Sequence, residues 1–169
     1  YLNVMKKSRE MMPDVGLSTD IISCFPGETE DDHKMTMDVI REVRYDGAYT
    51  FVYSPRENTK AIYMKDDIDE DTKTRRLDEI ITLQRKISVE INSELVGKTK
   101  KVLIESLSRK SDEFYMARTD CNKSVIIPAQ TGHVNDSGEL IMKKTYKIGD
   151  LLNVKISKAN SATLFGEAV

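Results

Sequence analysis

The residues best placed for ligand chemistry follow a short run of strand-forming residues. That run stops at Pro26-Gly27, and Glu28 and Thr29 come next. Loops at the carboxyl ends of parallel strands are where α/β barrels hold their ligands, although a Pro-Gly pair is more often an ordinary turn before a helix. Arg56 follows the next strand-like segment. Its guanidinium suits a carboxylate or phosphate, and the alternative is a surface arginine paired with a nearby acid.

Metal and thiol chemistry find little support in the sequence. Cys24 and Cys121 are the two cysteines, and they form no C-x-x-C pair. They therefore predict neither a disulfide framework nor a complete metal site. Cys24 lies in an apolar segment, where a single cysteine is usually a small buried hydrophobe. His33 is expected on the exposed side of a helix, where it would titrate freely in solvent.

Charge is unevenly distributed along the chain. The net charge is −2, with 14 basic and 20 acidic residues in positions 1–96 and 12 basic and 8 acidic in positions 97–169. The basic half suggests a polyanionic partner, or else a solvated face. No apolar run approaches the roughly 20 residues that cross a bilayer, so we expect a cytoplasmic protein without membrane contact. The start at Tyr1, inside a helix-like pattern, is typical of an excised fragment.

Two β-α units are predicted in the first half. Residues 17–25 and 48–53 have strand composition, and each is followed by a segment of helical periodicity. The first helix should begin at Thr29, whose hydroxyl can cap it with Asp32 three residues on. Gly97 should close the second as its C-terminal cap. Two parallel strands cannot bury themselves, so these units indicate part of a larger α/β barrel.

Beyond Gly97 the helical period disappears and short strands alternate with turn residues, including Asn135-Asp136-Ser137-Gly138. We therefore place a domain boundary between residues 96 and 97, with a small closed antiparallel barrel over residues 97–169. The fold class is α/β plus all-β. The expected strands are residues 100–107, 114–119, 124–128, 139–143, 151–157 and 162–165.

Several strings resemble the radical S-adenosylmethionine methylthiotransferases. Residues 18–33, S-T-D-I-I-S-C-F-P-G-E-T-E-D-D-H, resemble the family's S-T-D-I-I-V-G-F-P-G-E-T-E-E-D. Residues 51–61, F-V-Y-S-P-R-E-N-T-K-A, resemble its F-x-Y-S-P-R-P-G-T-x-A. Residues 118–123, R-T-D-C-N-K, and 149–156, G-D-L-L-N-V-K-I, resemble the TRAM domain that ends these enzymes. The likeness covers essentially the whole chain. Its departures are Cys24 and Ala117, each for a usual glycine, and Glu57-Asn58 for Pro-Gly.

The resemblance implies the end of a radical S-adenosylmethionine TIM-like barrel followed by an OB-like TRAM barrel. The residues it implies for the S-adenosylmethionine side are Asp20, Ile22, Pro26, Gly27, Glu28 and Arg56. For RNA it favours a basic face that includes Lys100, Lys101, Arg118, Asn122 and Lys123. Arg109, Lys110, Phe114 and Tyr115 lie between these residues in sequence, and the aromatic rings would stack on bases. On composition alone, ordinary solubilising charge would explain the cations.

The R-T-x-x-N-K string favours the branch of the family that acts on tRNA bearing a prenylated adenosine. The implied reaction adds a methylthio group to carbon 2 of that adenosine, using S-adenosylmethionine and two 4Fe-4S clusters. Such a cluster needs a C-x-x-x-C-x-x-C loop, which this sequence lacks. We therefore expect no catalytic residue and no bound cluster here, and partners in tRNA and the remainder of the same polypeptide. The alternatives are a stand-alone RNA-binding module, or the same chemistry on a threonylcarbamoyl adenosine or a ribosomal protein.

Overall fold

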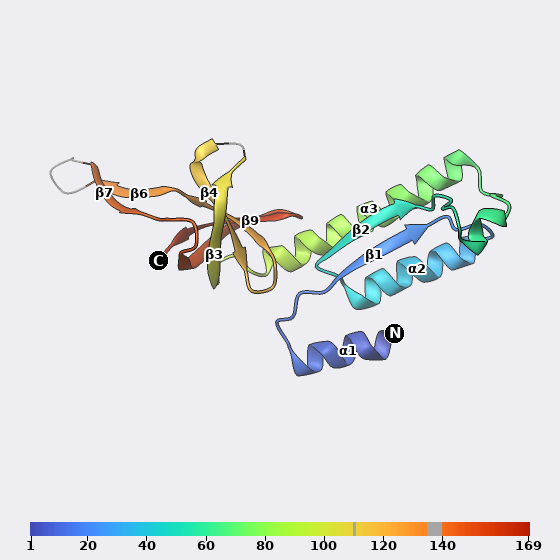
Figure 1. Ribbon diagram of the computed structural model, residues 1–169. Helices are drawn as coiled ribbons and strands as arrows, with labels where there is room; N and C mark the ends of the chain where they lie inside the picture. Colours follow the sequence, from blue (N-terminus) through green and yellow to red (C-terminus); the bar gives the residue numbers. More distant parts are fainter. Residues whose placement is uncertain (110, 135–139) are drawn as a thin grey trace. The chain divides into compact units, whose positions relative to one another are not determined.

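The computed structural model describes residues 1–109, 111–134 and 140–169. These residues form two compact units, 1–88 and 89–169 (Figure 1). The division falls a few residues before the boundary that the sequence suggested, inside the last turns of a long helix. Lys110 and the turn expected at residues 135–138 lie outside the described residues.

The first unit contains a two-stranded parallel sheet, as the repeated strand-helix pattern predicted. Ser18 pairs with Gly47 at one end and Ser23 with Val52 at the other. The elements of this unit are α1 (Leu2–Met11), β1 (Ser18–Ser23), α2 (Glu30–Val43), β2 (Gly47–Val52), the short 3-10 helix η1 (Lys60–Tyr63) and α3 (Glu70–Ser93), whose last residues belong to the second unit.

Helix α2 begins where its capping residues predict. The Asp32 backbone N–H donates to Thr29 Oγ1 at 3.2 Å, and the Thr29 backbone N–H donates to Asp32 Oδ2 at 2.9 Å. Each bond satisfies a donor that the first helical turn leaves unpaired. The other end closes at Arg44 in a left-handed conformation, with φ of 51°. The local prediction for this helix is therefore confirmed at atomic detail.

One face of the β1–β2 sheet is covered and the other is open. The covering layer consists of buried side chains from α2, α3 and the segment before β2. Gln84 of α3 donates from Nε2 to the Tyr45 carbonyl oxygen at 2.7 Å, and Ser88 donates to that of Asp46 at 2.9 Å. The buried apolar residues are Ile40, Val43, Tyr45, Ile80 and Ile87.

The second unit is built around a closed five-stranded barrel in the order β3-β4-β5-β9-β8. All neighbours are antiparallel except β5 and β9, which pair in parallel, so the expectation of a purely antiparallel barrel was wrong in this one pairing. A separate hairpin, β6–β7, was predicted only in its second strand. The strands are β3 (Thr99–Ser108), β4 (Ser111–Thr119), β5 (Ser124–Pro128), β6 (Gln130–Val134), β7 (Leu140–Thr145), β8 (Leu151–Ala159) and β9 (Thr163–Ala168).

Alternate residues of the barrel strands fill its interior. Val102, Ile104, Val154 and Ile156 are each at most 1% exposed, which follows the period of two in the sequence. At Gly166 strands β8 and β9 approach closely. A Cβ atom built there would lie 2.4 Å from the Lys155 carbonyl oxygen, so only glycine fits.

The final turn of α3 is bonded to barrel residues. Asn92 is 4% exposed, and its Nδ2 donates to the Asn160 carbonyl oxygen at 2.8 Å. Gly97 does not close the helix as expected: its N–H donates to the Ile156 carbonyl oxygen at 2.8 Å, which starts the pairing of β3 with β8. These bonds explain why the compact unit begins inside the helix rather than after it.

Candidate functional site

The loop after β1 contains a tight turn over residues 25–28. The Glu28 N–H donates to the Phe25 carbonyl oxygen at 2.8 Å, with Pro26 and Gly27 between them. Gly27 has φ of 84°, and proline followed by a residue of positive φ is the signature of a type II turn. Cys24, just before the turn, also adopts a left-handed conformation, with φ of 62°, and is 1% exposed. Cys24 is thus the buried small residue that the sequence predicted.

Side chains from three places hold this turn. The Cys24 N–H donates to Glu28 Oε2 at 2.9 Å, and the Gly27 N–H donates to Asp67 Oδ1 at 3.0 Å. Arg76 donates through Nη1 to the Glu28 carbonyl oxygen at 3.0 Å and to Glu28 Oε1 at 3.1 Å. Two of the three anchors therefore lie far along the chain, Asp67 in the loop just before α3 and Arg76 in the second turn of that helix.

A chain of ion pairs continues from Arg76 across α2 and α3. Arg76 and Arg75 both bind Glu30, at 3.2 and 2.8 Å, and Arg75 also binds Glu79 at 2.8 Å. Hydrogen bonding from Arg75, aided by Arg76, lowers the pKa of Glu30 to about 2. Hydrogen bonds from Arg75 and then His33 lower the pKa of Glu79.

His33 is a correction to the sequence analysis. Its side chain is 2% exposed and its Nε2 lies 2.8 Å from Glu79 Oε2, so it does not lie free in solvent. The helical position was correctly expected, but the long-range partner on α3 was not visible in the local pattern. His33 is thus the buried end of the ion-pair network that joins α2 to α3.

The open face of the β1–β2 sheet carries paired side chains beside the turn. Ile22 on β1 pairs with Phe51 on β2, and both are exposed, by 61% and 52%. Two residues earlier in each strand, on the same face of the sheet, the exposed Asp20 pairs with Tyr49. An apolar pair next to a carboxylate can contact a flat, partly polar ligand from one side.

The start of the β2–α3 loop contains the remaining candidate on this side. Arg56 is exposed, and its guanidinium has no partner in the described part of the chain, so it does not form there the surface ion pair that was the alternative to ligand binding. Nearer the sheet, the Tyr53 ring packs edge-on against Phe25 with centroids 4.9 Å apart. Tyr53 Oη is buried and lacks a hydrogen-bond partner among the described residues. The Tyr53 hydroxyl is thus a hydrogen-bond donor near the turn that no described residue accepts from.

On the barrel, three residues expected to bind RNA organise the β4–β5 connection. Arg118 binds Glu105 through Nε at 2.9 Å and Asn122 Oδ1 through Nη1 at 3.0 Å. Asn122 has φ of 62°, as the turn requires. Lys123 Nζ lies 3.0 Å from Asn92 Oδ1 at the end of α3. The string therefore has a structural role on its own domain, and its role toward RNA stays a prediction.

The other basic candidates lie on different sides of β3. Lys101 is exposed on the outer surface, whereas Lys100 is half-buried at the neighbouring position. Tyr115 is 9% exposed and its hydroxyl donates to the Tyr146 carbonyl oxygen at 2.8 Å, so its predicted stacking role is wrong. Phe114 retains 38% exposure.

The outer surface of β3 and β8 combines Lys101, which the sequence analysis proposed, with three residues that it did not single out. We call Lys101, Leu103, Leu151 and Lys155 the β3–β8 face. Leu103 and Leu151 are paired and exposed by 40% and 60%, while Lys101 lies opposite Asn153 and Lys155 opposite Thr99. The alternation of strand residues could have revealed this face, because its members are all odd-numbered positions.

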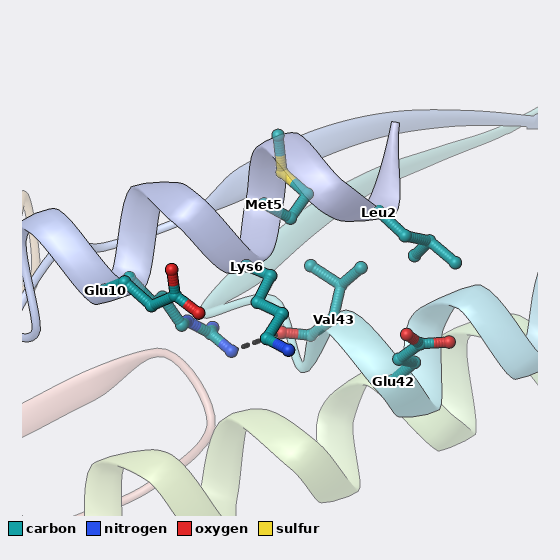
Figure 2. A pocket seen from close by; sticks show the side chains of 7 residues that line it. Leu2, Met5, Lys6, Glu10, Glu42 and Val43 are labelled. Atoms are coloured by element: carbon teal, nitrogen blue, oxygen red, sulfur yellow. Dashed lines mark hydrogen bonds between the residues drawn. The ribbon is translucent and has the colours of Figure 1, made fainter.

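A pocket of about 410 Å³ lies between α1 and the end of α2 (Figure 2). Its lining mixes both charge signs with apolar side chains, including Lys6 and Glu42. Arg9 donates to the carbonyl oxygens of Val43 and Arg44 at 2.5 and 2.7 Å, which caps the end of α2. Arg9 is therefore engaged in capping α2. The side chains that line the pocket include no nucleophile with an adjacent base.

Neither a metal cluster nor a membrane-spanning helix is found among residues 1–109, 111–134 and 140–169. No group of three or more His, Cys, Asp or Glu side chains is arranged to hold a metal ion among these residues. No helix in the same part of the chain combines the length and apolar character of a membrane span.

Comparisons with known proteins match both units. Residues 93–169 match the TRAM domain family. Over 99% of its length the chain is 44% identical to a tRNA-2-methylthio-N(6)-dimethylallyladenosine synthase of Azobacteroides pseudotrichonymphae, of which it covers 34%. Proteins of the same name from Chloroherpeton thalassium and Clostridium novyi are 43% and 40% identical over the whole chain, which covers 35% and 34% of them. The chain thus spans about a third of the length of these relatives.

Proposed function

Because this chain is homologous over its whole length to the C-terminal third of tRNA-2-methylthio-N(6)-dimethylallyladenosine synthases and carries a TRAM domain, we propose that it serves as the C-terminal part of a tRNA methylthiotransferase. In this proposal the first unit completes a cofactor-binding barrel and the second binds tRNA. The observation that carries it is the match over both units rather than the TRAM domain alone. A stand-alone RNA-binding module would not need a homologous α/β unit.

The reaction follows from the relatives' name: a methylthio group is added to the adenine of N6-dimethylallyladenosine in tRNA. S-adenosylmethionine and two iron-sulfur clusters would supply the methyl group, the sulfur and the radical chemistry. This chain has two cysteines, too few for the thiolates of such clusters. Its own residues would therefore bind and orient, and the cluster ligands would come from elsewhere. A cytoplasmic location goes with this proposal.

The open β1–β2 face is consistent with a larger barrel. Ile22, Tyr49 and Phe51 are each more than half exposed here, an unusual state for neighbouring strands of a parallel sheet. Further strands on either side would enclose them. The same reasoning favours the radical S-adenosylmethionine barrel over a free two-stranded unit.

The residues at the carboxyl ends of these strands fit S-adenosylmethionine. Ile22 and Phe51 offer an apolar contact for adenine, and Tyr53 Oη is a donor without a partner in the described residues. The Asp20 carboxylate would accept hydrogen bonds from the ribose hydroxyls, and the Arg56 guanidinium would bind the amino-acid carboxylate. Pro26 to Glu28 form the turn that borders this surface.

For tRNA we propose the outer surface of the barrel. Residues 97–169 have a surplus of four positive charges, and phosphate contacts dominate RNA affinity. Lys101 on the β3–β8 face is exposed, and Arg118 lies on the adjacent strand opposite Leu103. Asn122, Lys123 and Lys100 are the other candidates, with the structural contacts described above.

The deciding experiment deletes the encoding gene and analyses tRNA nucleosides by mass spectrometry. We expect the methylthio form of the prenylated adenosine to disappear and its unmethylthiolated precursor to accumulate. Loss of methylthiolation on threonylcarbamoyl adenosine or on a ribosomal protein would assign a different substrate. An unchanged nucleoside and protein profile would contradict the transferase function itself.

A further inference from the structure

The turn after β1 is held at two backbone positions from outside its own segment. Gly27 donates its N–H to Asp67, and the Glu28 carbonyl oxygen accepts from Arg76. Both partners lie around the start of α3, Arg76 within its second turn and Asp67 in the loop just before it. The shape of the turn therefore depends on residues about forty positions further along the chain.

This turn needs such support because its backbone is not relaxed. Cys24 has φ of 62°, whereas glycine at position 27 adopts its φ of 84° without strain. A non-glycine residue in the left-handed region persists only where surrounding contacts hold it. The Cys24 N–H is fixed by Glu28, and Glu28 in turn is fixed by Arg76, so the arginine acts on both ends of the loop.

Arg76 and its neighbour Arg75 differ in one decisive respect. Both bind Glu30, but only Arg76 reaches Glu28. The Arg76 side chain is 6% exposed, and that of Arg75 is 45% exposed. A buried guanidinium that binds two carboxylates and a carbonyl uses several donors of its planar fork at once, which a lysine cannot do.

We propose that Asp67 and Arg76 are positioning residues that set the shape of the 24–28 loop and so its affinity for the adenosyl cofactor. The inference rests on the proposed function, in which this loop borders bound S-adenosylmethionine. Neither side chain needs to touch the cofactor. The start of α3 would control cofactor affinity by fixing the Gly27 N–H and the Glu28 carboxylate in place.

The first test compares two substitutions at Asp67 in the complete, cluster-loaded protein. Asp67 is exposed, so its substitution leaves the buried side chains in place. Asp67→Ala and Asp67→Asn remove the same charge, but only the amide oxygen of asparagine can accept the Gly27 hydrogen bond. Equilibrium binding of S-adenosylmethionine should weaken by about tenfold in Asp67→Ala and by less than about twofold in Asp67→Asn. The affinity for tRNA should be the same in both variants.

The second comparison uses the adjacent arginines. Arg76→Lys should weaken S-adenosylmethionine binding by about tenfold or more, whereas Arg75→Gln, which loses its own two ion pairs, should stay within about twofold of the original protein. Thermal unfolding of each variant reports whether it is folded. Equal cofactor affinities for Asp67→Ala and Asp67→Asn would overturn the inference for Asp67, and equal effects of the two arginine variants would overturn it for Arg76. If the unsubstituted protein itself binds no S-adenosylmethionine, the proposed function fails.

Discussion

The proposal that the barrel binds tRNA through the β3–β8 face can be tested at its two lysines. Lys101 and Lys155 both point outward from neighbouring strands, and Lys155 is two positions beyond the direct partner of Lys101. Residues in this diagonal arrangement are roughly 7–8 Å apart at their Cα atoms. From this Cα spacing, the flexible lysine side chains can bring their two ammonium groups to neighbouring phosphates of one strand. Removing both in the variant Lys101→Ala with Lys155→Ala should therefore remove two phosphate contacts.

The magnitude follows from counterion release. Each phosphate contact contributes about 0.7 to 0.9 to the slope of log affinity against log salt concentration, so the double variant should flatten the slope by about 1.4 to 1.8. Filter binding of tRNA between roughly 50 and 200 mM salt measures it. The matched control is Lys6→Ala with Lys7→Ala on α1, which removes the same charge from two exposed lysines of the other unit. It should leave the slope nearly unchanged.

A comparison with Arg118→Ala and Lys123→Ala separates binding from structure. This pair also lowers the slope if both side chains reach phosphates, as the sequence predicts. It additionally removes the contacts of Arg118 with Glu105 and of Lys123 with Asn92, so the barrel should unfold at lower temperature. Equal slopes for the Lys101 and Lys6 double variants would refute the assignment of the β3–β8 face, whatever the second pair does.

Two further predictions concern stability. Gly166→Ala should lower the free energy of unfolding of the barrel by more than about 3 kcal/mol in urea titrations, because the new Cβ meets backbone of Lys155 that cannot rotate away. Gly47→Ala, with nothing within 4 Å, is its control and should change far less. Arg75 lowers the pKa of Glu30 from 4.5 to about 2, so ionised Glu30 stabilises the folded protein at neutral pH. The unsubstituted protein should therefore lose this stabilisation as the pH falls from 4.5 toward 2. Glu30→Gln should be less stable at pH 6, and the melting temperatures of the two proteins should converge near pH 2.

Local signals in the sequence predicted what local interactions determine. Thr29 and Asp32 are three residues apart, and their reciprocal hydrogen bonds need no other part of the chain, so the start of α2 was correctly predicted. The alternation of strand residues likewise predicted all five strands of the closed barrel and missed only β6 of the separate hairpin. His33 and Gly97 were misjudged because their partners, Glu79 and Ile156, are distant in sequence. No periodicity contains that information.

The basic string of the barrel shows why a motif can be recognised before its role is understood. Arg118, Asn122 and Lys123 are close in sequence and polar, which suggested a loop reaching for phosphate. In the structure each has a partner within the second unit, and Lys123 together with Asn92 joins the β4–β5 connection to the last turn of α3. A residue type can therefore recur in a family because it holds a turn in place, and exposed neighbours such as Lys101 can contact the ligand instead. The salt-slope comparison distinguishes the two roles, since a side chain that only holds the turn changes the melting temperature and leaves the slope unaltered.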